Sequence, residues 1–353
     1  MTITFLLGNG FDLNLGLKTR YRHFYDYYLK QESKNETIAD FKKALSDNLE
    51  NWADLEIELG KYVNNFTKET ENQFIDLLYD IQDSLANYLD NQDSVFIISE
   101  DDKKKSINDL IKFETYFTPR EKADFLSYKN QLNTNSYDIN IITFNYTKTF
   151  EKIYNWKGAT LNIGNRKVGN TVYNDTIKIL EHIHGTTTDN MILGVNDSSQ
   201  IYCDELKQSV RTMRALIKTE MNVNAGTLRD SRCETAIKQS DIICVYGMSL
   251  GDTDKVWWKN IGTRIAQSNT RLVIFSRAEQ LPTRRAYAGS NYKDEIKECF
   301  LNHLAYDEPS KEKLKEKIFV CLNSSMFKVN LDYGTNSEIE ATLETEGVLA
   351  VKP

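Results

Sequence analysis

Two glycines and an acid follow the first apolar run of the chain, in the stretch TFLLGNGFD at residues 4–12. Gly8 and Gly10 flank Asn9, and Asp12 comes two residues later. A phosphate group can approach a backbone closely where no Cβ atom intervenes, and the N–H groups at the start of a helix hold its charge. The spacing therefore predicts a phosphate-binding turn, with a plain tight turn as the alternative interpretation.

Two of the four histidines stand together in HIHG, as His182 and His184 followed by Gly185. Residues two apart in a strand point to the same face. A metal site is one interpretation, but the segment has no carboxylate at the usual ligand spacing, and a hydrogen-bonded structural histidine is another. We favour one histidine as an acid or base, because its pKa suits proton transfer near neutral pH. His184 lies nearer the strand end and is the catalytic candidate, with His182 lining the cavity beside it.

Two further polar residues stand where apolar residues would be expected. Asn145 ends the apolar run of ITFNYT, and it either forms a turn or hydrogen-bonds a sugar hydroxyl or a water. Glu56 falls on the apolar stripe of a predicted helix, one turn after Trp52 and one turn before Leu59. A carboxylate there is costly unless it is paired or lines a cavity, and the sequence leaves both interpretations open. If Glu56 lines the cavity, Trp52 is expected to line it as well.

Most of these candidates follow short apolar runs that read as buried parallel strands. In an open α/β sheet, ligands bind at the carboxyl ends of the strands, so the candidates should gather at one edge. Ser249 and Asp254 join them because they follow the run DIICVYG. Strands are predicted at residues 3–7, 138–144, 178–185, 191–195, 241–247 and 271–276.

The order of the elements predicts a doubly wound, mostly parallel α/β fold with a large helical insertion after the first strand–helix unit. Residues 1–34 and 135–332 would form the α/β domain, residues 35–134 the inserted helical subdomain, and residues 333–353 a loose tail. Helices are expected from 3.6-residue apolar periodicity within residues 20–30, 50–66, 73–89, 104–132, 254–267, 291–304 and 310–322.

Composition narrows the class of protein. The net charge of −7 argues against a broad nucleic-acid-binding surface, and no apolar run approaches the roughly 18 residues of a membrane helix. The N-terminal residues lack the basic region of a signal peptide, so a cytoplasmic protein without a membrane partner is expected. The five scattered cysteines indicate core thiols rather than disulfides or a zinc site.

Taken in order, the motifs resemble one bacterial family. GNGFD, WADLE, TFNYT, IHG, ILGVND and YGMSLGDTD, spread over residues 3–275, are similar to the AbiH family of phage abortive-infection proteins. The same order more distantly resembles the Rossmann-like fold of the sirtuin-type NAD-binding proteins. That resemblance implies an antiviral defence protein that binds NAD.

Carried over residue by residue, the resemblance makes Asn145 and His184 the catalytic pair. It implies a stripped-down NAD hydrolase rather than a deacylase, because the zinc-binding cysteine pairs of deacylating sirtuins are absent. At the position of Thr147, sirtuin-like NAD hydrolases often carry an Asp that binds the nicotinamide amide. Because Thr replaces it here, the resemblance leaves open whether the nucleotide is NAD or a related one. No permanently bound cofactor is expected, and NAD would be substrate or ligand. The expected nucleotide-binding residues are Gly8, Asn9, Gly10, Asp12, Thr147, Gly185, Gly247, Ser249 and Asp254.

Three functions fit these residues. The leading hypothesis is an abortive-infection effector that hydrolyses NAD to nicotinamide and ADP-ribose. The second is a metal-dependent nuclease in which Asp12, Asp252 and Asp254 converge on Mg²⁺. The third is a nucleotide sensor without turnover. The sequence leaves undecided whether a phage-derived trigger binds the protein and whether the protein forms a homo-oligomer.

Overall fold

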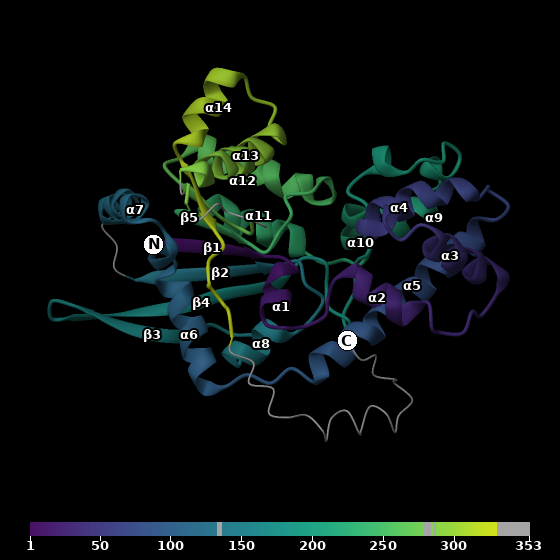
Figure 1. Cartoon of the computed structure of the whole chain (residues 1–353), viewed down its shortest axis with the longest axis horizontal. Helices are drawn as coiled ribbons and strands as arrows, with labels where there is room; N and C mark the ends of the chain where they lie inside the picture. The colour runs from purple at the N-terminus through teal and green to yellow at the C-terminus, as the bar shows by residue number, and fades with distance from the viewer. Residues whose placement is uncertain (133–135, 279–283, 286, 330–353) are drawn as a thin grey trace.

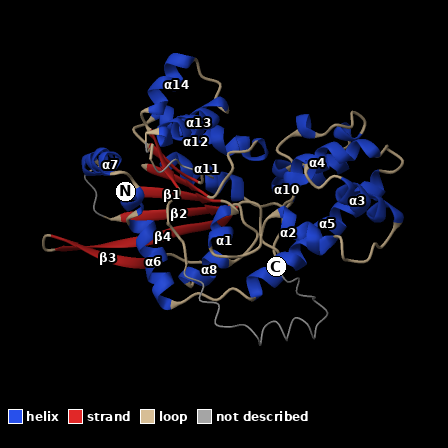
Figure 2. Ribbon diagram, viewed as in Figure 1, coloured by secondary structure: helices blue, strands red, loops and turns tan. Residues whose placement is uncertain are grey.

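A computed structural model describes residues 1–132, 136–278, 284–285 and 287–329. Its described strands form one seven-stranded sheet in the order β3-β4-β2-β1-β5-β6-β7 (Figures 1 and 2). All neighbouring pairs are parallel except β3 and β4, which form an antiparallel hairpin at one edge. The predicted mostly parallel α/β sheet is therefore confirmed. The strands are β1 (Thr2–Leu7), β2 (Tyr137–Thr143), β3 (Leu161–Val168), β4 (Thr171–His182), β5 (Ile242–Tyr246), β6 (Arg271–Ser276) and β7 (Ile318–Leu322).

Helices cover both faces of the sheet, which explains why its central strands are apolar runs rather than alternating patterns. One face buries a core shared with α1 (Gly10–Asn14), α6 (Glu100–Ile111), α7 (Pro119–Gln131) and α8 (Thr149–Tyr154). The other face packs against α11 (Arg229–Gln239), α12 (Lys255–Gln267), α13 (Ala288–Asn302) and α14 (Glu308–Lys315).

A separate group of helices stands beyond the carboxyl ends of the strands, on the right of Figure 1. These helices share their own hydrophobic core, so the segment 35–134 contributes to two cores. Its first part joins this helical group, whereas α6 and α7 pack on the sheet. The helices of this core are α2 (Tyr21–Tyr28), α3 (Glu36–Asp47), α4 (Leu55–Tyr62), α5 (Glu71–Ser94) and α9 (Val210–Leu216), and α10 (Lys218–Asn224) lies beside α9.

Three expectations about individual elements were wrong. Residues 191–195 form no strand, because only Val195 makes a single parallel bridge, to Ile217. The segment 310–322 was expected to be one helix, but it contains the end of α14 and then β7, whose buried residues extend the sheet. The segment 50–66 is broken by Asp54, which caps α4 by accepting hydrogen bonds from the N–H groups of Glu56 and Ile57.

Two features of composition can be placed in the fold. All five cysteines lie in the described part of the chain and are unpaired; four are buried and Cys299 is exposed. Among the described helices, none is both long and apolar enough to cross a bilayer. The expected tail at residues 333–353 lies outside the described residues.

Candidate functional site

A cavity of about 560 Å³ opens at the carboxyl ends of β1, β2 and β5, where the helical group meets the sheet. From β1 the chain first builds the sheet on one side, through β2 and β4, and then crosses to β5 on the other side. Such a reversal of strand order creates a crevice that ligands occupy in open α/β sheets. The cavity lining includes these residues expected from the sequence: Gly8, Asn9, Gly10, Asp12, Glu56, Asn145, Thr147, His184, Gly247, Ser249 and Asp254.

The glycines of the β1–α1 turn have a packing reason that the sequence did not suggest. The N–H groups of Gly8 and Gly10 donate to the carbonyls of Tyr246 and Gly247, at 2.9 and 2.8 Å. A Cβ on Gly10 would lie 2.4 Å from the Cα of Gly247, and a Cβ on Gly8 would lie 2.6 Å from the Cγ of Met248. The missing side chains therefore make room for the turn after β5, and these two N–H groups are already engaged.

Asp12 is a buried carboxylate in the wall of this cavity, 1% exposed. Its two oxygens accept hydrogen bonds from Thr147 Oγ1 at 2.6 Å and Thr149 Oγ1 at 2.7 Å. Burial raises the pKa of Asp12 to about 6, although both hydroxyls lower it. Thr147 stands where the resemblance implies an Asp, and its hydroxyl thus donates to an acid from another part of the chain, Asp12.

Asn145 follows β2 and presents a buried amide to the cavity. Its Nδ2 is buried and has no partner at full hydrogen-bond geometry among the described residues, although the Asn145 side chain lies close enough to Asp12 to lower the pKa of that carboxyl. A buried donor without a partner costs free energy, so such a group usually has a ligand or a water as its partner. The Asn145 amide is therefore a candidate for ligand binding beside the Asp12 carboxylate.

His182 lies behind the cavity wall rather than in it, contrary to expectation. Its Nδ1 is 2.8 Å from the carbonyl oxygen of Asn145, and its Nε2 is 2.9 Å from Glu151 Oε1. Both ring nitrogens are therefore engaged within the protein. The contact fixes the main chain of Asn145, so His182 can position that residue.

His184 lines the cavity itself and is 5% exposed. Burial, together with the charge of Lys218, lowers the pKa of His184 well below its usual value. The ring packs against the rings of Phe144 and Tyr146, and its Nε2 lies 3.6 Å from Asp254 Oδ1. A neutral imidazole results, which is the form that can accept a proton, but the lowered pKa makes His184 a weaker base than the near-neutral pKa expected from the sequence.

Glu56 both lines the cavity and forms a buried ion pair, so the two interpretations left open by the sequence hold together. Lys218 Nζ lies 2.8 Å from Glu56 Oε2 and 3.2 Å from Asp254 Oδ1. Burial raises the pKa of Glu56 to about 7, against the lowering effect of Lys218. Burial opposes the charge on Lys218, but Asp254 and Glu56 together raise its pKa.

Sequence reasoning missed Lys218, the first residue of α10. Its neighbours Leu216 and Ile217 are buried, so a lysine directly after this apolar pair was the available signal. Through its two ion pairs, Lys218 joins Glu56 of α4 to Asp254 in the segment that follows β5. Lys218 therefore fixes how the helical group closes the cavity over the sheet.

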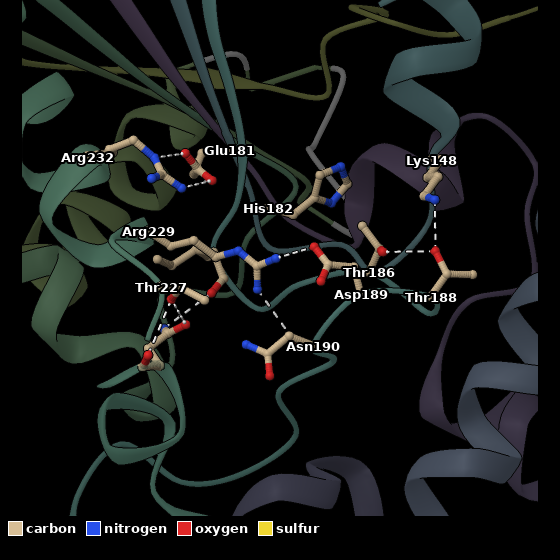
Figure 3. A network of polar contacts seen from close by, with 12 residues as sticks. Lys148, Glu181, His182, Thr186, Thr188, Asp189, Asn190, Thr227, Arg229 and Arg232 are labelled. Carbon is tan, nitrogen blue, oxygen red and sulfur yellow. Dashed lines mark hydrogen bonds and ion pairs between the residues drawn. The ribbon is translucent and has the colours of Figure 1, made fainter. Parts of the chain in front are cut away.

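The turn after His184 is fastened on two sides (Figure 3). Arg229 Nη2 donates to Asp189 at 2.6 Å, and Lys148 Nζ donates to Thr188 Oγ1 at 2.8 Å. Gly185 was expected to bind nucleotide but lies outside the cavity. It has a φ of +73°, and a Cβ there would lie 1.9 Å from the carbonyl oxygen of Asn190, so glycine serves the turn.

The loop after β5 carries Ser249 and Asp254 into the cavity wall. Trp258 Nε1 donates to the carbonyl of Gly251 at 2.9 Å and fixes this loop from α12. Asp252 faces His303 instead, and its side chain is 74% exposed. Because Asp252 points away from Asp12 and Asp254, the three aspartates of the nuclease hypothesis do not converge. Within the described ranges, no group of three His, Cys, Asp or Glu residues could hold a metal ion.

Contrary to expectation, Trp52 does not line the main cavity. It lines an adjoining cavity of about 370 Å³. The hydroxyl of Tyr25 donates to the carbonyl of Trp52 at 2.8 Å and holds this segment against α2. Residues 52–56 thus serve both cavities: Trp52 lines the second, Asp54 starts the helix, and Glu56 reaches the first.

The fold and the site define an α/β protein with a cavity of small-molecule size, lined by polar and apolar side chains, at the carboxyl edge of its sheet. The sequence profile of the bacteriophage abortive infection AbiH family matches residues 4–276, and the chain belongs to this family. The match covers all the cavity residues considered above. No curated protein matches the chain in sequence. Family membership indicates a function in abortive infection by bacteriophages.

Proposed function

We propose that this protein is an abortive-infection effector that hydrolyses NAD at the bond between nicotinamide and ribose. The observation that carries the proposal is the cavity that brings Asn145, His184 and Asp12 together at the switch point of the sheet. Its volume of about 560 Å³ lies in the range of small-molecule sites.

The reaction demands little from a nucleophile. The bond between ribose C1′ and the nicotinamide nitrogen breaks, and its electron pair leaves with nicotinamide as a neutral base. The ribose ring becomes oxocarbenium-like and positively charged, and a water oxygen adds to C1′. The protein must hold the ribose, place the water, accept one proton and stabilise the positive charge.

The residues of the cavity suit these tasks. The Asn145 amide, whose Nδ2 has no partner at full hydrogen-bond geometry among the described residues, would bind a ribose hydroxyl or the water. His184, kept neutral by burial and by Lys218, would accept the proton. The carboxylates of Asp12 and Asp254 would face the positive charge, because both line the same cavity.

The topology supports a dinucleotide ligand. The six parallel strands, β4-β2-β1-β5-β6-β7, have the spatial order of the doubly wound folds that bind dinucleotides at the switch point. The proposal does not rest on phosphate binding by Gly8 and Gly10, because their N–H groups bond to the turn after β5.

Product analysis tests the proposal. The purified protein is incubated with NAD, with ATP and with DNA, with and without EDTA, and the products are separated by chromatography. We expect nicotinamide and ADP-ribose from NAD in both conditions. Cleavage of DNA that EDTA abolishes would instead favour a nuclease, and NAD binding without products would leave a sensor.

A further inference from the structure

A second cavity adjoins the first and differs from it in chemistry. The two share three lining residues, Asn9, Tyr21 and Ala53, so they lie next to each other. The second has two arginines and one carboxylate, Glu50, among its aromatic side chains, whereas the wall of the first has one arginine, Arg277, and the carboxylates of Asp12, Asp54, Glu56 and Asp254. The remaining residues of the second cavity are Arg20, Arg22, Tyr25, Leu49, Glu50 and Trp52.

The two arginines of this cavity are exposed, and neither has an ion-pair partner in the part of the chain that the structure describes. The charge of Arg20 acts on His23, whose pKa is lowered by burial and then by the charges of Arg20 and Lys18. An unpaired guanidinium presents a planar fork that matches phosphate oxygens. The arginines are therefore available to an anionic ligand.

The half-buried ring of Tyr21 provides a surface for a base, whereas Tyr25 and Trp52 are only 2% and 6% exposed. The rings of Tyr21 and Tyr25 are stacked, with centroids 6.4 Å apart and planes 16° apart. Tyr25 is tied to Trp52 through the hydrogen bond to its carbonyl, so the aromatic wall is held as a unit. Nucleotide bases stack on such rings, with about 1–3 kcal/mol per base in single-stranded complexes.

From these features we infer that the second cavity is the subsite for the adenosine-phosphate half of a dinucleotide. Its arginines bind phosphate and its aromatic rings contact the base. The inference rests on the proposed function, which places the nicotinamide riboside half in the first cavity. The shared residues Asn9 and Tyr21 then lie at the join, where the pyrophosphate crosses.

The charge distribution supports this orientation over the reverse one. The nicotinamide riboside half is cationic and meets Asp12, Glu56 and Asp254, whereas the pyrophosphate is anionic and meets the arginines. At the other end of the first cavity, Arg277 is already engaged, because its Nη2 donates to Asn14 Oδ1 at 2.8 Å.

Calorimetry with ADP tests the subsite without needing turnover. The affinity for ADP is measured for the wild type, for the double variant Arg20→Ala/Arg22→Ala, and for Arg120→Ala as a control. Arg120 is also an exposed arginine, but it lies in α7, whose helix packs on the sheet. Thermal melts should coincide, because all three side chains are exposed.

We expect the double variant to bind ADP about 10- to 100-fold more weakly, because it loses charge-assisted contacts, and the control to be unchanged. The KM for NAD should rise with kcat held. Unchanged ADP affinity in the double variant, or no ADP binding by the wild type, would overturn the subsite whatever the NAD assay gives. Loss of ADP binding in the double variant of a protein that does not hydrolyse NAD would refute the proposed reaction and keep the subsite.

Discussion

Replacing Lys218 by Met should destabilise the protein by roughly 3–5 kcal/mol near pH 7.5, because it leaves buried carboxylates without their cation. Lys218 Nζ lies 2.8 Å from Glu56 Oε2 and 3.2 Å from Asp254 Oδ1. The side chains of Lys218 and Glu56 are 8% and 9% exposed, so water from the cavity replaces little of the lost partner. Met has a similar length and leaves little empty space.

The loss should grow with pH above neutrality. Burial raises the pKa of Glu56 to about 7 while Lys218 lowers it, so removing Lys218 raises this pKa further. Above pH 7 the folded variant then holds a proton that the folded wild type has released. The difference in unfolding free energy therefore increases by about 1.4 kcal/mol per pH unit in that range. Below pH 7 both folded proteins hold the proton and the difference is smaller and constant.

Urea unfolding followed by circular dichroism at pH 6, 7 and 8 measures both effects. Lys238→Met is the matched control, because Lys238 pairs with Glu234 on the surface, where its side chain is 69% exposed. That variant should lose less than about 1 kcal/mol, with little change over this pH range. A Lys218→Met variant as stable as the control, or one whose loss does not change with pH, would show that the buried ion pair does not hold the cavity together.

Gly10→Ala should lower the melting temperature, with a loss of roughly 1–3 kcal/mol, because its Cβ would meet the Gly247 backbone at 2.4 Å; Gly251→Ala, where the nearest contact is 3.4 Å, should melt like the wild type. Equal melts for the two variants would return the Gly8–Gly10 turn to a ligand-binding explanation. Asp12→Asn should reduce NAD turnover, and wild-type turnover should fall as the pH drops below about 6, where Asp12 becomes protonated. The raised pKa of Asp12 costs the folded wild type stability as the pH rises through about 6. Asp12→Asn has no such proton to lose, so its stability relative to the wild type should be greater at pH 7.5 than at pH 4. A difference that stays constant over this range would contradict the raised pKa. His182→Ala should lower the melting temperature and retain part of the NAD turnover, since His182 reaches the site only through the carbonyl of Asn145. Complete loss of turnover with an unchanged melt would instead make His182 part of the chemistry.

Sequence patterns predicted the parallel strands of the sheet well, because burial on both faces leaves an unmistakable apolar run. They failed where a pattern had two interpretations. The run 191–195 is apolar because it packs in the helical group, and only Val195 makes a bridge. The segment 318–322 is too short for its period to separate a strand from the end of a helix, and pairing with β6 decides it.

The positions of the candidate residues at strand ends were predictable, because topology alone brings those ends together. The contacts that give each residue its chemistry were not. The close approach of Gly10 to Gly247 joins segments more than 230 residues apart in the chain, and the ion pair of Glu56 with Lys218 spans 162 residues. No local pattern encodes such partners. The lining of the second cavity by Arg20 and Trp52 likewise depends on how α2 packs against residues 49–53.

Release of nicotinamide from NAD by the wild type, Asn145→Ala, His184→Ala and the double variant tests the central claim most directly. Each purified protein is assayed beside its thermal melt. The account predicts release by the wild type, and loss of turnover in each single variant with a double variant little worse, because residues that act as a unit give non-additive losses. A folded His184→Ala protein that releases nicotinamide at the wild-type rate would contradict it.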